Sequence, residues 1–283
     1  MTMQRSTFTS PVDDLELATY EWDVAEPRGV VQIAHGLAEH SARYDRFARA
    51  LNGAGYTVRA ADHRGHGASI AGTPGDFGTA GFEALIADMA AYGASLRGDL
   101  PLFLFAHSMG SFAAQSVMLT HSEQYAGVVL SGSTTLDLLA AGMAQAEGPV
   151  GLEAFNAGFE QRTGYEWLSR DEGEVDRYVA DPLCGFDLPD KTVPALFGAA
   201  DTLADPTALS GIRSDLPLLV ASGSDDPLAG GGQLVEELAQ RYRDAGLVDV
   251  TVRLYVGARH EILNELNRDE VTADVVAWLD AHL

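Results

Sequence analysis

The sequence predicts an α/β fold, with a mostly parallel central sheet covered by helices on both faces and a helical cap inserted into it. Two observations predict this class. Short apolar runs alternate along the chain with longer segments of helical periodicity, which is the order that builds parallel β-α-β units. Residues 133–205 interrupt this alternation with short amphipathic pieces separated by glycine and proline. We therefore expect a core of residues 1–132 and 206–283, and a cap of residues 133–205.

The expected strands are short and rich in apolar residues. Residues 102–106 (Leu-Phe-Leu-Phe-Ala) form a continuous apolar run, which is typical of a strand buried on both faces of a parallel sheet. In chain order, the expected strands cover residues 15–23, 30–35, 56–61, 102–106, 127–132, 217–222 and 250–256, and the expected core helices cover residues 41–54, 81–97, 109–121, 233–245 and 268–282. Within the insertion we expect helical pieces over residues 136–146, 151–159, 167–168 and 174–179.

A serine stands at the junction between one of these strands and the next helix. Ser108 lies two positions after the end of the expected strand at 102–106 and directly precedes the expected helix at 109–121. The motif Gly-x-Ser-x-Gly at such a junction forms a sharp turn that holds the serine hydroxyl above the sheet. Here the motif reads Ala106-His-Ser-Met-Gly110, with a methyl group at its first position. A serine that only caps the following helix would give a similar pentapeptide, so the positions of the serine's partners must decide.

The partners of such a serine follow it in a fixed order. In folds of this class an acid comes next and a histidine last, each after a later strand. His260 follows the expected strand at 250–256. The two other downstream histidines are set aside, because His121 lies in the helix after the turn and His282 is the penultimate residue. The loop after the strand at 217–222 reads Ser-Gly-Ser-Asp-Asp and offers both Asp225 and Asp226. The residues alone leave both acids open.

Several motifs together give the chain a family resemblance. They are residues 35–40 (His-Gly-Leu-Ala-Glu-His), Arg43-Tyr44, residues 62–69 (Asp-His-Arg-Gly-His-Gly-Ala-Ser), residues 107–110 (His-Ser-Met-Gly), residues 223–226 (Gly-Ser-Asp-Asp) and residues 257–260 (Gly-Ala-Arg-His). With these motifs the chain resembles α/β-hydrolases of the monoacylglycerol lipase and bacterial lysophospholipase type from about residue 30 onward. It departs from the family at Ala106, where glycine is usual. The resemblance implies Asp226 as the acid and Leu37 as a backbone donor to an oxyanion.

These groups together predict acyl transfer to water. A serine hydroxyl is a poor nucleophile, and His260 has the near-neutral pKa that a general base needs. Asp226 would hold the imidazole in the useful tautomer and stabilise the imidazolium. The oxyanion of the tetrahedral intermediate needs fixed donors. We expect one from the N–H of Met109, at a helix start whose dipole favours an anion, and the second from Leu37.

The insertion is expected to shape the substrate pocket. Leu139, Met143, Phe155 and Phe159 could line an apolar acyl channel, although a stripe that faces the core would give the same pattern. The expected substrates are monoacylglycerols, lysophospholipids or similar short- to medium-chain carboxylic esters. The alternatives are an amidase, an aminopeptidase or a perhydrolase of the same fold, or a ligand-binding protein that keeps the triad.

Composition excludes several other classes. The formal net charge of −23 argues against nucleic acid and anionic membrane surfaces as partners. No segment has the roughly 18 unbroken apolar residues needed to span a bilayer. The N-terminus is polar and without an apolar signal region, and Cys184 is the single cysteine. These features favour a cytoplasmic enzyme.

We expect no metal and no cofactor. Asp62, His63 and His66 fall close together, but a zinc site needs a further converging ligand that the sequence does not supply. The glycines at 230–232 lack the lysine and spacing of a phosphate-binding loop. We interpret the first stretch as a glycine-rich turn after a strand, and the glycines at 230–232 as a flexible lead into the helix that begins at Gln233.

Overall fold

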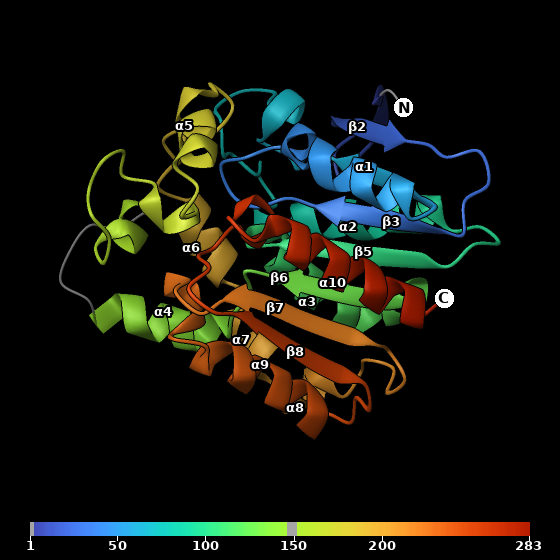
Figure 1. The fold of residues 1–283 in the computed structure, drawn as a ribbon. Helices are drawn as coiled ribbons and strands as arrows, with labels where there is room; N and C mark the ends of the chain where they lie inside the picture. The colour runs from blue at the N-terminus through green and yellow to red at the C-terminus, as the bar shows by residue number, and fades with distance from the viewer. Residues whose placement is uncertain (1–2, 146–151) are drawn as a thin grey trace.

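The computed structural model describes residues 3–145 and 152–283, and it is built around one mixed sheet of eight strands (Figure 1). The strand order is β1-β2-β4-β3-β5-β6-β7-β8. The strands from β3 to β8 pair in parallel, whereas β1 and β2 are antiparallel to their neighbours. Their bounds are β1 Gln4–Thr9, β2 Glu16–Trp22, β3 Gly29–Ala34, β4 Tyr56–Ala61, β5 Leu102–His107, β6 Gly127–Ser131, β7 Leu218–Gly223 and β8 Val250–Tyr255.

Helices cover the sheet on both faces. On one face, α1 (Asp45–Gly53) and α10 (Arg268–Ala281) pack through Phe47, Leu51 and Val275. Figure 1 shows these two helices crossing the face of the sheet nearest the viewer. On the other face lie α2 (Phe82–Leu96), α3 (Met109–His121) and α9 (Gln233–Asp244). Because both faces are covered, every residue of the central strands β5, β6 and β7 is buried, as their apolar sequences predict.

A helical insertion separates β6 from β7 and gathers at one end of the sheet, on the left of Figure 1. Two of its helices, α6 and α7, were not predicted, because each is barely a turn or two long and has too few residues to show a period. Ala146 and Gly151, where we expected helical pieces to end and begin, lie outside the described residues. The insertion contains α4 Leu136–Gln145, α5 Glu172–Ala180, α6 Thr192–Phe197 and α7 Ala200–Ala204, with 3₁₀ turns at Leu152–Asn156 and Glu166–Leu168, and α8 Pro206–Leu209 follows it.

Strand β1 is an addition to the predicted elements. It pairs antiparallel with β2 at the edge of the sheet, and its residues (Gln-Arg-Ser-Thr-Phe-Thr) are almost all exposed. A strand exposed on both faces has no buried side chains and therefore no apolar alternation for a sequence pattern to detect.

Within residues 3–145 and 152–283, no helix combines the length and the apolar character that crossing a bilayer requires.

Candidate active site

Ser108 occupies a sharp turn between β5 and α3. Its backbone has φ 52° and ψ −122°, a conformation that residues with a side chain rarely adopt. The turn has no room for a side chain at Gly110, where an added Cβ would lie 2.5 Å from the carbonyl oxygen of His35. Ala106, in contrast, is fully buried in the sheet between Ala34 and Leu130. The turn therefore forms with a methyl group at the first position of the motif.

His260 joins Ser108 to Asp226 through two hydrogen bonds. The Nε2 atom of His260 lies 2.9 Å from Ser108 Oγ, and its Nδ1 atom lies 2.9 Å from Asp226 Oδ2. The Asp226 carboxylate also accepts hydrogen bonds from Ser222 Oγ at 3.1 Å and from the Leu228 N–H at 2.9 Å. These contacts fix the carboxylate and leave the imidazole bridging it to the serine.

The neighbouring acid is placed differently. Asp225 is exposed and accepts a hydrogen bond from the Ser224 hydroxyl at 2.8 Å. Of the two acids that the sequence left open, the structure brings Asp226 to His260. The two histidines set aside in the sequence also lie elsewhere: His121 ends α3, and His282 contacts Asp249 at 3.0 Å.

Burial and charge act in opposite directions on this pair. Desolvation disfavours the imidazolium of His260, but the Asp226 carboxylate outweighs it and holds the pKa of His260 above its ordinary value. In the same way, burial would raise the pKa of Asp226, but His260 and the hydrogen bonds to the carboxylate keep it below its ordinary value. The pair therefore favours an ionised aspartate and a histidine that is readily protonated.

The loop after β3 approaches Ser108 closely. An added Cβ at Gly36 would lie 2.8 Å from Glu39 Oε1 and 3.1 Å from Ser108 Cβ, so a side chain there would displace these neighbours. Leu37 follows it and lines the same pocket as Ser108 and Met109. The N–H of Met109 is the first of α3 and has no preceding carbonyl within the helix to accept it. The structure thus brings Leu37 and Met109, the two expected oxyanion donors, to the walls around Ser108.

A buried ion network supports this loop. Glu39 accepts hydrogen bonds from the Gly36 N–H at 2.6 Å, from Tyr44 Oη at 2.8 Å and from Arg43 at 2.7 Å. The other side of the Arg43 guanidinium makes two hydrogen bonds to Glu261, at 2.6 and 2.7 Å. Burial alone would raise the pKa of Glu39, yet Arg43 and the hydrogen bonds hold it below its ordinary value. Arg43 therefore links the loop at Gly36 to the loop that carries His260, which the sequence did not predict.

An apolar pocket of about 530 Å³ opens beside Ser108. Of the four residues that we expected to line an acyl channel, Leu139, Met143 and Phe155 line this pocket. Phe159 is not among the lining residues, and its ring lies under the Arg259 guanidinium at 4.5 Å. Among the described residues that line the pocket, Ser108 is the one polar residue, and the others are Leu37, Met109, Phe112, Leu152, Trp167, Val193, Leu196, Phe197 and Leu228.

Three histidines lie buried behind the loop at Gly36. The ring centroids of His35 and His63 are 4.3 Å apart, and those of His35 and His66 are 5.3 Å apart. Burial lowers the pKa of His35 and His63 well below the ordinary value and that of His66 to about 4. All three rings are therefore neutral in the folded protein at neutral pH.

These histidines predict a loss of stability in mild acid. In the unfolded chain they take up protons near pH 6.5, so their contribution is complete above that pH and is lost as the pH falls toward 4. We expect the free energy of unfolding, measured by urea titration, to fall by about 3–5 kcal/mol between pH 7 and pH 5. His66→Gln should make this pH dependence shallower, by up to about 1.4 kcal/mol per pH unit. An unchanged slope in the variant would contradict the assignment.

One group among the described residues has the donors for a metal ion. The ligand atoms of His40, Asp181 and Cys184 lie within 4.8 Å of one another. However, His40 Nε2 and Asp181 Oδ2 are already hydrogen-bonded at 2.9 Å, and burial raises the pKa of the Cys184 thiol, which disfavours the thiolate that binds metals. At the stretch from Asp62 to His66, the Asp62 carboxylate is used by Tyr20, Ser41 and Ala68. We assign no metal to either group.

The mostly parallel sheet, with its serine turn between a central strand and the following helix, defines an α/β hydrolase. Residues 25–267 match the Hydrolase_4 family, described as serine aminopeptidase, S33, and the chain belongs to this family.

Its relatives include lipases and esterases. The chain is 31% identical to a monoacylglycerol lipase of Mycolicibacterium smegmatis, over 91% of this chain and 90% of the relative, and 31% identical to a monoglyceride lipase of Homo sapiens, over 88% and 80%. Among solved structures, it is similar to a thermostable carboxyl esterase from Bacillus coagulans (TM-score 0.84, 27% identity, 99% of both chains). It is also similar to a monoacylglycerol lipase of Paleococcus ferrophilus (TM-score 0.71, 26% identity, 95% of this chain and all of the other).

Proposed function

We propose that the protein is a serine carboxylic ester hydrolase that works through an acyl-enzyme and acts on monoacylglycerols, lysophospholipids or similar short- to medium-chain esters. The observation that carries the proposal is the hydrogen-bonded chain of Ser108, His260 and Asp226 at the end of an apolar pocket. The relatives named as lipases and esterases support the same reaction class. In this proposal, residues 133–205 form the cap over the site.

The proposed reaction divides into two steps. As Ser108 Oγ bonds to the ester carbonyl carbon, its proton moves to Nε2 of His260, and the N–H groups of Leu37 and Met109 donate to the oxyanion. The imidazolium then protonates the leaving alcohol, and an acyl group remains on Ser108. Water attacks this ester in the second step, with His260 again as base. Asp226 holds Nδ1–H throughout and stabilises the imidazolium.

The pocket favours an ester of an apolar acyl chain over a peptide. An aminopeptidase must hold the ammonium group of its substrate, and a carboxylate near the nucleophile would do so. Within residues 3–145 and 152–283, the residues that line the pocket at Ser108 include no carboxylate, and all but Ser108 are apolar. A chain of methylene groups gains about 0.8 kcal/mol for each one buried in such surroundings.

Hydrolysis of p-nitrophenyl esters of graded chain length, run beside monoacylglycerols and aminoacyl p-nitroanilides, tests the proposal. We expect ester turnover to rise with chain length to an optimum set by the pocket, and we expect no release of p-nitroaniline. Leu139→Trp, which narrows the pocket from α4, should shorten the optimal chain while leaving acetate ester turnover within about threefold. Release of p-nitroaniline with no ester turnover would replace the proposal with the aminopeptidase alternative.

A further inference from the structure

The indole of Trp167 lies against the imidazole of His260. The two ring centroids are 4.8 Å apart with an interplanar angle of 38°, and both residues are almost completely buried, with 3% and 2% of their surface exposed. Trp167 comes from the 3₁₀ turn Glu166–Leu168 of the insertion, whereas His260 comes from the loop after β8. The insertion therefore contributes the side chain that covers one side of the proposed base.

The imidazole of His107 also lies against His260. The centroid of His107, the residue before Ser108, lies 4.7 Å from that of His260. Gly132 leaves space for both rings, because a Cβ there would lie 2.9 Å from His107 and 3.0 Å from His260. Burial, with the nearby His260, lowers the pKa of His107 to about 4, so this neighbour is neutral when His260 becomes charged. His260 is thus held between Trp167 and a neutral imidazole.

The backbone fixes Trp167 relative to His260. The N–H groups of His260 and Glu261 donate to the carbonyl oxygens of Trp167 and Leu168, at 3.3 and 2.8 Å, and Arg259 donates to the Glu166 carbonyl at 2.7 Å.

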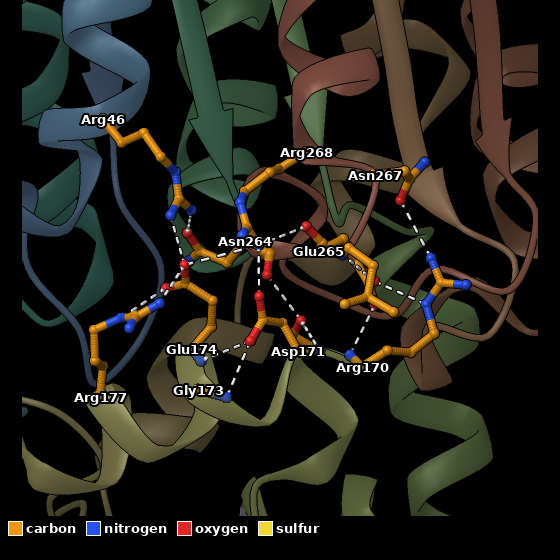
Figure 2. A network of polar contacts seen from close by, with 12 residues as sticks. Arg46, Arg170, Asp171, Gly173, Glu174, Arg177, Asn264, Glu265, Asn267 and Arg268 are labelled. Carbon is orange, nitrogen blue, oxygen red and sulfur yellow. Dashed lines mark hydrogen bonds and ion pairs between the residues drawn. The ribbon is translucent and has the colours of Figure 1, made fainter.

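Further polar contacts follow at Arg170 and Asp171, directly before α5, as Figure 2 shows. Arg170 bonds to Glu265 at 2.8 Å, and Asp171 pairs with Arg268 at 2.7 Å. The Glu265 side chain is completely buried. These contacts run from Glu166 to Asp171 and hold the backbone segment that carries Trp167 against the loops around His260.

The Trp167 indole contributes a ring surface and no hydrogen bond. Within the described part of the chain, Trp167 Nε1 has no hydrogen-bond partner, although it is buried. An unpaired buried donor is destabilising, so no hydrogen bond explains why an indole stands there. Its ring packs against Phe155 at 5.1 Å, and its centroid lies 4.8 Å from that of His260 at an interplanar angle of 38°. Of the aromatic side chains, tryptophan attracts a cation most strongly through its ring face.

We propose that Trp167 is a positioning residue for His260, and that the face of its indole stabilises the imidazolium each time His260 takes up the Ser108 proton. The role in turnover rests on the proposed function. The charged or titratable groups around His260 are Asp226, His107, Glu39 and Glu261, and the last two share the Arg43 guanidinium. Trp167 adds an uncharged surface that favours the cation without competing for its protons.

A titration of the His260 imidazole by NMR tests the proposal without any substrate. We expect Trp167→Leu to lower the pKa of His260 by about 0.5 to 1.5 units, and Trp167→Phe to lower it by less, because a cation over an aromatic ring is stabilised in the order Trp, Phe, Leu. The acid limb of the pH profile of kcat/KM should move to lower pH by the same amount. An unchanged pKa of His260 in both variants would overturn the proposal. If the leucine variant does not fold, the phenylalanine variant decides alone.

Trp278→Phe is a matched control. Trp278 is also buried, its Nε1 also lacks a partner among the described residues, and its ring lies 4.4 Å from that of His282, which pairs with Asp249. It lies far from the site, at the end of α10, so the pKa of His260 should not change. A purely space-filling role for Trp167 would change KM and the optimal chain length while leaving that pKa in place. A shifted pKa without ester turnover would instead refute the proposed function alone.

Discussion

Ser108→Ala is expected to lower kcat for ester hydrolysis by about 10⁵- to 10⁶-fold while leaving the fold intact. The variant keeps the pocket and the backbone donors but removes the hydroxyl that becomes acylated in the proposed mechanism. Ser108 is partly exposed and its hydroxyl bonds to His260, so its loss leaves no large cavity. Steady-state rates measured with a p-nitrophenyl ester, together with thermal unfolding of both proteins, check this result. Ser111→Ala, one turn along α3, is a control in the same helix.

A loss of less than about tenfold in Ser108→Ala would place the chemistry elsewhere. Loss of activity accompanied by unfolding would show damage to the turn instead, and the retained melting temperature is what separates the two outcomes.

Asp226→Asn is expected to lower kcat by about 10⁴-fold, and Asp225→Asn to change it by less than about threefold. An amide at position 226 can donate to Nδ1 and so favours the wrong tautomer of His260, in which Nε2 carries the proton and cannot accept one from Ser108. It also removes the charge that stabilises the imidazolium. Asp225 is exposed, and its carboxylate bonds only to Ser224 among the described residues. Its amide variant should therefore change neither the tautomer of His260 nor the charge beside it.

The two variants differ by one position and remove the same charge. Equal losses, or a larger loss in Asp225→Asn, would contradict the assignment of the acid. The pH profile adds a second readout, because loss of the Asp226 charge should lower the pKa of His260 and move the acid limb of kcat/KM to lower pH.

The parts of the fold that the sequence predicted are those with a strong local pattern. The apolar run predicted at 102–106 is β5 (Leu102–His107), and the predicted helix at 109–121 is α3 (Met109–His121). Their burial on both faces makes the apolar pattern continuous and easy to detect. Strand β1, with its exposed polar residues, gave no such pattern.

The candidate site also has parts that a local sequence pattern predicts and parts that it does not. Ser108, His260 and the acid loop stand in short motifs at strand ends, and chain order alone suggested that they meet. Trp167 and Arg43 contact segments that are far from them in the sequence: Trp167 lies against His260, and Arg43 bonds to Glu261, 218 residues away. The periodicity of apolar residues tells which face of a helix or strand is buried, but not which distant loop packs against it. No local pattern could therefore predict that Trp167 contacts His260.

The most direct test of the proposed mechanism is reaction with an alkyl fluorophosphonate, followed by intact-protein mass spectrometry and peptide mapping. Phosphonates of this kind bond covalently only to an activated serine, and they do so without requiring deacylation. We predict one adduct per chain, on Ser108, with labelling abolished in Ser108→Ala and strongly slowed in Asp226→Asn. No adduct on the folded protein, or an adduct on another serine with Ser108 unmodified, would contradict a serine hydrolase centred on Ser108.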